Sequence, residues 1–294
     1  MRAHLGLFVS SAALGGLAVV GKITMREIPP GLLCLARAGG SAVILHAAAR
    51  WRGGRQPRGF GEYGRLALFS LLGVVFNQLL FLYGLNRTTA TAAAILVCAI
   101  PVFTAIFAVL LNAEVLTVRR AGGIGLAVGG VLVLLNAGVS DLGGSDLVGN
   151  LMIVANAAFY GIYLVLSRPL ARRLGSLPMM AWIFTFGALG VLPLGLRDAA
   201  GLDFAAVSAR AWAGMAYIVV FASALAYWLV LWALPTAGST VSASYTYLQP
   251  VVAAALAAVF LSERLTARDA LAAALVFAGV YLTSERGVSR TRAA

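Results

Sequence analysis

The stretch YTYLQPVVAAALAAVFLSERLT, residues 245–266, decides the fold of this chain. It begins with aromatic, hydroxyl and amide side chains, passes through Pro250 into an apolar run, and ends in charged residues. A helix in water does not favour the internal proline, because proline cannot donate a backbone hydrogen bond. A helix surrounded by lipid does not favour Gln249, because burying an unpaired amide is costly. A membrane helix tolerates both residues where its polar groups face a cavity or other helices.

The composition of the whole chain points to the same setting. Of its 294 residues, 61% are hydrophobic and only 11% are charged, and the mean hydropathy is +0.94. These values are far from those of a soluble globular domain. Ten segments are long and apolar enough to cross a bilayer as helices: 5–21, 30–49, 66–84, 89–111, 120–137, 150–167, 177–196, 211–232, 239–261 and 268–284. We therefore predict an all-α integral membrane protein with ten transmembrane helices and short connections.

The net charge of +12 indicates orientation rather than a nucleic-acid partner, because no soluble module carries it. If the N-terminus faces the cytoplasm, 14 basic residues fall on the cytoplasmic side, 7 fall outside, and Arg37 lies within a span. Basic residues concentrate in cytoplasmic loops. We therefore expect a multi-pass protein of a bacterial-type inner membrane, in contact with the lipid bilayer and with both termini in the cytoplasm.

The chain contains an internal repeat. Residues 96–117 align with residues 245–266 without gaps, at an offset of 149. The matched pairs include Pro101 and Pro250, Glu114 and Glu263, Thr117 and Thr266, and Arg119 and Arg268. Alanines and leucines match by chance, but these residue types rarely do so in one register. Such self-similarity predicts two homologous halves of five spans each, residues 1–140 and residues 141–294.

Because five is an odd number, the second half enters the membrane from the opposite side. Inverted repeats of this kind are typical of secondary transporters, in which two halves exchange conformations around a central cavity to give alternating access. A channel or a membrane enzyme can also be built from repeats, so the pattern favours a transporter without excluding them.

Two repeats of five spans, each with a fourth span that carries a proline and ends in E-x-L-T, resemble the EamA-type carriers of the drug/metabolite transporter superfamily. The most specific matches run from Pro101 to Arg119 and from Pro250 to Arg268, and the resemblance covers the whole chain. Among these carriers the chain most resembles exporters of amino acids and related metabolites, including the YddG-type exporters of aromatic amino acids. The resemblance implies a basket of ten helices around a central cavity and export of small organic solutes without ATP.

Charged residues are nearly absent from the predicted spans. All ten acidic residues fall in loops or at helix ends. Carriers coupled to protons or sodium often hold a carboxylate near the middle of the membrane, so this pattern favours facilitated or weakly coupled export. Arg37 is the basic residue clearly inside a span. It either pairs with a substrate carboxylate, or extends toward the membrane surface or binds backbone carbonyls.

Uncharged polar and aromatic side chains supply the predicted substrate site. The candidate substrate-binding residues are Asn77, Gln78, Asn156, Tyr160, Tyr163, Trp182, Phe221, Trp228, Tyr245 and Gln249. Aromatic walls with a few amide and hydroxyl groups suit a bulky, neutral or zwitterionic solute. Taken singly, each residue is equally consistent with an aromatic belt at the membrane surface or with a contact between helices.

Two further patterns concern the helices themselves. Pro101 and Pro250 each deprive the carbonyl four residues earlier of its usual donor, so each helix is expected to bend there, either as a hinge or as a static kink. Small residues in 121–130 and 270–279 favour close helix packing, so that these helices either support each half or join two protomers, and an oligomer remains open.

The sequence offers no catalytic or metal-binding cluster, because Cys34 and Cys98 fall within spans and only two histidines are present. We therefore expect no enzyme activity, no cofactor and no metal. We predict a secondary transporter that exports a small-molecule substrate, an aromatic or bulky neutral amino acid, by alternating access. An exporter of other metabolites or drugs and a channel-like facilitator remain the alternatives.

Overall fold

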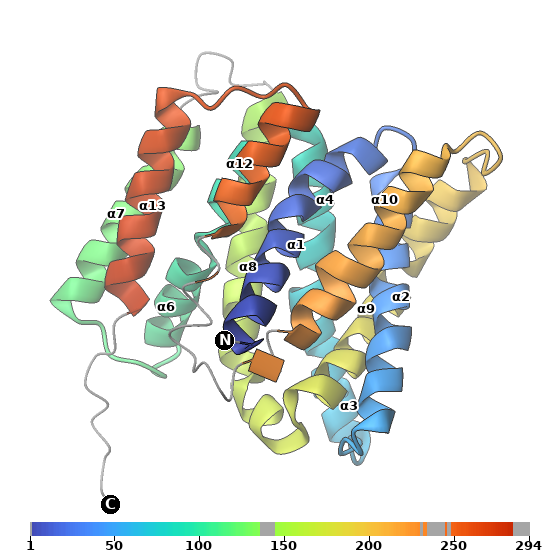
Figure 1. The fold of residues 1–294 in the computed structure, drawn as a ribbon. Helices are drawn as coiled ribbons and strands as arrows, with labels where there is room; N and C mark the ends of the chain where they lie inside the picture. Colours follow the sequence, from blue (N-terminus) through green and yellow to red (C-terminus); the bar gives the residue numbers. More distant parts are fainter. Residues whose placement is uncertain (1, 136–144, 230–231, 234–244, 246–247, 285–294) are drawn as a thin grey trace, which may run out of the picture.

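The computed structural model describes residues 2–135, 145–229, 232–233, 245 and 248–284, and within these ranges every regular element is a helix (Figure 1). In chain order the helices are α1 (Arg2–Thr24), α2 (Pro30–Trp51), α3 (Phe60–Ser70), η1 (Leu71–Phe76), α4 (Asn77–Arg87), α5 (Ala90–Val97), α6 (Ile100–Leu110), α7 (Val118–Leu135), α8 (Ser145–Leu174), α9 (Ser176–Ala200), α10 (Ala209–Val219), η3 (Val220–Leu225), α12 (Leu248–Phe260) and α13 (Ala267–Ser284). The helices run between two ends of a bundle. We call the end where α1 begins the lower end and the end where α1 finishes the upper end, as they lie in Figure 1.

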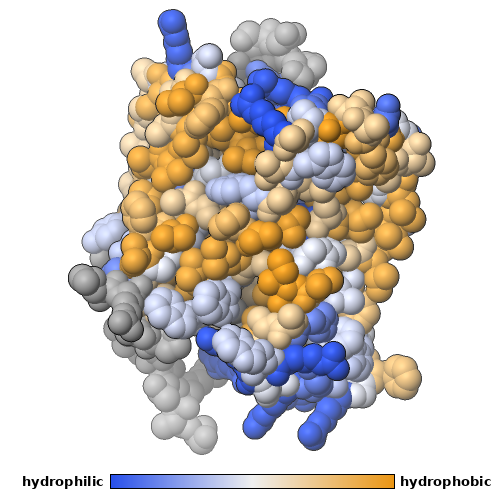
Figure 2. All heavy atoms as spheres, turned by 45° about the vertical axis from the view of Figure 1, so that its right-hand side comes forward, coloured by the Kyte–Doolittle hydropathy of each residue, from blue (hydrophilic) through white to orange (hydrophobic). Residues whose placement is uncertain are grey.

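Eight described helical stretches are long and apolar enough to cross a membrane. They are Ala3–Thr24, Pro30–Trp51, Phe60–Arg87, Ala90–Leu110, Val118–Leu135, Asp146–Leu174, Leu177–Ala200 and Ala209–Leu229. Figure 2 shows the consequence on one face, where hydrophobic residues form a broad belt and hydrophilic residues gather at both ends. The first part of the predicted ninth span lies outside the described residues, and α12 and α13 cover the remaining two predicted positions. The count of ten spans stays a prediction.

The helices α7 and α13 lie side by side at one edge of the bundle (Figure 1). Their backbones approach closely through glycines. A Cβ atom added to Gly279 would lie 2.5 Å from the carbonyl oxygen of Gly123, and one added to Gly130 would lie 2.8 Å from the carbonyl oxygen of Ala272. The small residues of these two segments therefore pack α7 of the first predicted half against α13 of the second, a contact between the halves that the sequence did not predict.

Two spans contain a wider, π-helical turn in their interior. The first turn is η1, which joins α3 to α4, and the second is η3, which follows α10. Both turns are six residues long, and they begin at Leu71 and Val220, which are separated by the same offset of 149 as the internal repeat. π-Helical turns are rare and frequently accompany functional sites.

A third interruption divides the span that contains Pro101. α5 ends at Val97, and the backbone N–H groups of Cys98 and Ala99 bond to carbonyls only three residues earlier. α6 then begins at Ile100, so Pro101 occupies its first turn, where proline is tolerated. In the second half, Pro250 likewise lies in the first turn of α12, and the residues just before that helix lie outside the described ranges.

Acidic side chains hold the upper ends of helices that start there. Asp198, near the end of α9, accepts hydrogen bonds from the backbone N–H groups of Gly31 at 2.8 Å and Leu32 at 3.3 Å. These N–H groups have no partner inside α2, and the helix dipole favours a negative charge beside them. The contact fixes the start of α2 against α9.

Glu27, in the connection between α1 and α2, binds the start of α10 in the same way. Its carboxylate accepts hydrogen bonds from the backbone N–H of Ser208 at 2.7 Å and from the Ser208 hydroxyl at 2.8 Å. These hydrogen bonds, followed by the charge of Arg210, hold the pKa of the Glu27 carboxyl below its ordinary value. The charged form of Glu27 is therefore the form that this contact stabilises.

Candidate transport site

A buried group of amide side chains lies where α4 packs against α8. The Asn156 side chain, which is 2% exposed, donates a hydrogen bond from Nδ2 to the backbone carbonyl of Asn77 at 2.5 Å. Gln78 is equally buried, and its Oε1 accepts the Cys34 thiol of α2 at 3.7 Å. Three of the residues predicted for substrate binding are thus brought together, although Asn77 contributes its backbone to this bond rather than its side chain.

Tyrosines of α8 extend this group along the same helix. The rings of Tyr160 and Tyr163 lie 5.4 Å apart. Tyr163 is buried and packs on Gly73 of η1, where an added Cβ would lie 2.8 Å from the Tyr163 ring. Tyr227, which follows η3, faces Phe184 of α9 with 5.9 Å between the ring centroids. The candidate residues of α8 therefore include a side chain that contacts the π-helical turn of the third span.

Arg37 is buried inside the span formed by α2, with 5% of its surface exposed. Its Nε donates a hydrogen bond to the hydroxyl of Ser223 in η3 at 2.9 Å, and that hydroxyl donates in turn to the carbonyl of Ile218 at 2.8 Å. Arg37 therefore does not extend to the membrane surface. The bond from Arg37 to η3 was not predicted from the sequence. The signal that could have suggested it is the polar residue Ser223 inside an apolar span.

Three other predicted residues have partners outside the amide and tyrosine group. Trp182 donates to the Gln56 side chain at 3.0 Å, in the loop before α3. Trp228 lies beneath Arg52, with 5.9 Å between the guanidinium carbon and the ring centroid. The Tyr245 hydroxyl lies 3.1 Å from the His4 ring. Gln56, Arg52 and His4 belong to the lower end, so these three residues lie there.

The remaining two predicted residues have different surroundings. Phe221 is 48% exposed and stacks on Tyr217 at 5.8 Å. Gln249 is partly buried, and its backbone carbonyl would lie 2.7 Å from a Cβ added to Gly15. The absence of a side chain at Gly15 thus allows α12 to approach α1 at the level of Pro250.

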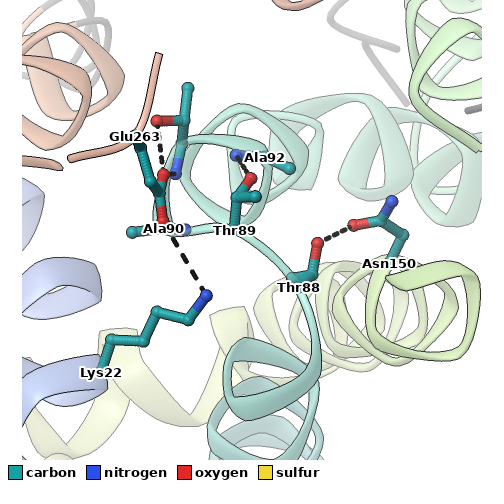
Figure 3. A network of polar contacts seen from close by, with 8 residues as sticks. Lys22, Thr88, Thr89, Ala90, Ala92, Asn150 and Glu263 are labelled. Atoms are coloured by element: carbon teal, nitrogen blue, oxygen red, sulfur yellow. Dashed lines mark hydrogen bonds and ion pairs between the residues drawn. The ribbon is translucent and has the colours of Figure 1, made fainter. Parts of the chain in front are cut away.

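Glu263 contacts residues of two other helices at the upper end, as Figure 3 shows. It follows α12 and accepts hydrogen bonds from the backbone N–H of Ala90 at 2.8 Å and from the N–H and hydroxyl of Thr91 at 3.1 and 2.9 Å. Lys22, near the end of α1, lies 3.8 Å from the same carboxylate. The Thr89 hydroxyl adds a local cap by accepting from the Ala92 N–H at 3.0 Å. One side chain thereby links α12, α5 and α1.

Glu114, the residue that matches Glu263 in the repeat, lies at the lower end, after α6. It forms ion pairs with Arg120 of α7 at 3.0 Å and with Arg168 of α8 at 2.9 Å. Sequence comparison paired the two glutamates but did not identify their partners. Each connector that follows a proline-containing span therefore carries a glutamate that binds a basic residue, and the two glutamates lie at opposite ends of the bundle.

None of the described acidic residues lies in the interior of a span, and no group of three His, Cys, Asp or Glu side chains in the described ranges is placed to hold a metal ion. The interior of the described bundle therefore offers amides, hydroxyls, aromatic rings and one guanidinium. These groups can bind and orient a polar organic molecule through hydrogen bonds and ring contacts.

Comparison with known proteins gives the family. The sequence profile of the EamA-like transporter family matches residues 1–136 and again residues 147–285. The transporter YetK of Bacillus subtilis is 28% identical over 96% of this chain and 87% of its own length. A transporter of Archaeoglobus fulgidus is 26% identical over 97% of this chain and 98% of its own. A probable terminal-alkyne amino-acid exporter of Streptantibioticus cattleyicolor is 29% identical over 89% of this chain and 86% of its own.

A solved crystal structure supports the fold independently. It superposes with a TM-score of 0.65 over 96% of both chains, at 19% sequence identity. At that identity the similarity concerns the fold.

Proposed function

Because the chain belongs to the EamA-like transporter family, we propose that it exports aromatic or bulky neutral amino acids by alternating access. The observation that carries the substrate class is the buried amide and tyrosine group between α4, η1 and α8, in an interior without a described carboxylate. Amides and hydroxyls bind the polar part of such a solute, and aromatic rings pack against its side chain. An amino-acid exporter among the relatives supports the same substrate class.

Recurring features support a chain built from two five-helix halves of opposite topology, residues 1–140 and residues 141–294. The family profile matches twice. The π-helical turns and the prolines recur at an offset of 149. Two halves with the same construction favour a mechanism in which they exchange conformations around one substrate site.

The two ends supply the contacts that such a mechanism requires. We propose that Glu263 closes the upper end through α5 and Lys22, and that Glu114 closes the lower end through Arg168. The lower end then faces the cytoplasm of a bacterial-type inner membrane, with both termini on that side. Since no described acid lies within a span, export is facilitated or weakly coupled.

The direct test is transport by the purified protein in liposomes. Labelled phenylalanine, tryptophan, leucine and alanine form the panel, and uptake is measured with and without unlabelled amino acid inside. We expect saturable uptake of the bulky members that accelerates when the same solute is present on the other side. Uptake that rises linearly with concentration and ignores the opposite side would identify a channel, and a panel without any uptake would refute amino-acid transport.

Variants connect transport with the site. Replacing Gln78 by leucine or Asn156 by leucine should raise the KM for phenylalanine, because each change removes buried amide groups from the site. Phe221→Leu is the matched control, because Phe221 is half exposed and its described ring contact is with Tyr217 rather than with an amide. Equal effects of all three changes on KM would contradict this site.

A further inference from the structure

The interior of the spans contains a buried cation that the described part of the chain leaves without a counter-ion. Arg37 is 5% exposed, and the described partner of its guanidinium is the neutral hydroxyl of Ser223. No described carboxylate lies within ion-pair distance of Arg37. A charge inside the membrane is costly, and it is typically paired or functional.

The surroundings of Arg37 combine polar groups from both halves of the chain. Cys34 lies one turn earlier on α2 and meets Gln78 of α4. Ser223, on η3, is fully buried. Arg37 therefore lies between the amide and tyrosine group on one side and the second π-helical turn on the other.

A second, independent observation comes from Ser41, which follows Arg37 by one helical turn and shares its face of α2. Ser41 is fully buried, and its hydroxyl has no hydrogen-bond partner in the described ranges. A buried hydroxyl without a partner loses the hydrogen bonds that it made in water. This face of α2 thus presents a cation and a free hydroxyl next to each other.

We propose that Arg37 is the residue that binds the carboxylate of the transported solute. A guanidinium carries five N–H donors in a planar fork, and Ser223 occupies Nε, which orients the fork. Two N–H groups of the fork can then bind both oxygens of a carboxylate, and Ser41 can donate a further hydrogen bond. Binding neutralises the cation, so the buried charge becomes paired when the solute arrives.

The charge balance selects a carboxylate over a phosphate. A phosphate monoester carries nearly two negative charges at neutral pH, and the other described basic residues lie at the ends of the spans, as Lys22 and Arg87 do. One guanidinium matches one negative charge. The solute is therefore a monocarboxylate, which includes zwitterionic amino acids.

This inference rests on the proposed function for its transport readout, and it is tested by comparing solutes that differ in one group. Phenylalanine has both charged groups, 3-phenylpropionate lacks the amine, and phenylalaninamide lacks the carboxylate. Each is used to inhibit uptake of labelled phenylalanine in liposomes. In the wild type, we expect the two carboxylates to inhibit strongly and phenylalaninamide to inhibit weakly.

Arg37→Gln should weaken inhibition by both carboxylates by about tenfold or more, because it removes one partner of a buried ion pair. It should leave inhibition by phenylalaninamide unchanged, and Arg37→Lys should retain part of the preference. Arg87→Gln is the control, because Arg87 lies at the end of α4 and binds the carbonyl of Tyr83. If the three solutes inhibit uptake by a folded Arg37→Gln variant in the same proportions as in the wild type, the proposal is overturned.

Binding is also measured without transport, so that the two hypotheses fail separately. Thermal unfolding of the purified protein is followed with each of the three solutes, in the wild type, Arg37→Lys and Arg87→Lys. Stabilisation by the two carboxylates that Arg37→Lys reduces and Arg87→Lys retains supports the site, even if no solute in the panel is transported. Equal stabilisation by phenylalaninamide, or none by either carboxylate, overturns it.

Discussion

Glu263, just beyond the end of α12, accepts a hydrogen bond from the backbone N–H of Ala90, the first residue of α5, at 2.8 Å. The two residues are 173 positions apart, so the bond connects the two predicted halves at the upper end. The first N–H groups of a helix have no partner within the helix, and a carboxylate both satisfies them and complements the helix dipole. The upper end is thereby held by a largely buried carboxylate, because the Glu263 side chain is 13% exposed.

The first prediction concerns this contact. Glu263→Gln should weaken closure of the upper end by about 2 kcal/mol, because the amide cannot replace a carboxylate that accepts three hydrogen bonds. In an Ala90→Cys variant without the native cysteines, labelling by a membrane-impermeant maleimide should therefore accelerate roughly 30-fold. Asp269→Asn is the matched control, because Asp269 lies in the first turn of α13 and its described bonds are to Thr266, just before that helix. Equal labelling of both variants would contradict the role of Glu263.

The second prediction concerns the opposite end. Glu114→Gln removes the ion pairs with Arg120 and Arg168 and should favour opening of the lower end. If the two ends open alternately, labelling at Ala90→Cys should become slower than in the wild type, the reverse of the effect of Glu263→Gln. The double variant should restore an intermediate rate. Faster labelling in the Glu114→Gln variant would show that the ends open independently.

These contacts mark the limit of what the sequence predicted. The spans were predictable because each is a continuous apolar segment whose boundaries depend on local composition. The shared helix of Asn156, Tyr160 and Tyr163 was predictable for a similar reason, since all three lie in one apolar segment at helical spacing. By contrast, the bond from Arg37 to Ser223 spans 186 residues and depends on how α2 packs against η3. No local pattern encodes that packing, so sequence left the role of Arg37 open.

The aromatic candidates illustrate the same limit. Trp182 and Trp228 have the residue type expected for either a cavity wall or a membrane-surface belt, and their positions along the spans do not decide between them. The structure places both at the lower end, beside Gln56 and Arg52. Residue type and periodicity thus identified the helices that carry polar groups, whereas the depth of each side chain required the tertiary arrangement.

The third prediction concerns pH and the contact between Glu27 and Ser208. The pKa of Glu27 is lowered in the folded protein, so the contact contributes its full stability above the ordinary carboxyl pKa and loses it as the pH falls through the lower, folded value. The melting temperature of the wild type should therefore exceed that of Glu27→Gln near neutral pH, and the difference should vanish in acid. Asp203→Asn serves as the control, since Asp203 bonds within its own loop to the N–H of Ala205. A difference that stays constant down to acidic pH would contradict this assignment.

The fourth prediction concerns the packing of α7 against α13. Gly279→Ala places a Cβ 2.5 Å from the carbonyl oxygen of Gly123, so the helices must separate, and the free energy of unfolding should fall by about 1–3 kcal/mol. Gly122→Ala is a close control on the same pair of helices, because a Cβ there meets no atom within 4 Å. Both can be measured by denaturant-induced unfolding in detergent. Loss of stability in Gly122→Ala alone would place the packing face on the other side of α7.

The last prediction decides between a hinge and a static kink at Pro101. The break between α5 and α6 comes just before this proline, and the Pro101→Ala variant regains a backbone donor that can extend α5 through the break. We expect a slower transport rate, because a continuous helix resists the bending that alternating access requires. Pro193→Ala is the control, because Pro193 lies within an uninterrupted α9. A folded Pro101→Ala variant that transports at the wild-type rate would identify a static kink, since the break would then shape the helix without taking part in its motion.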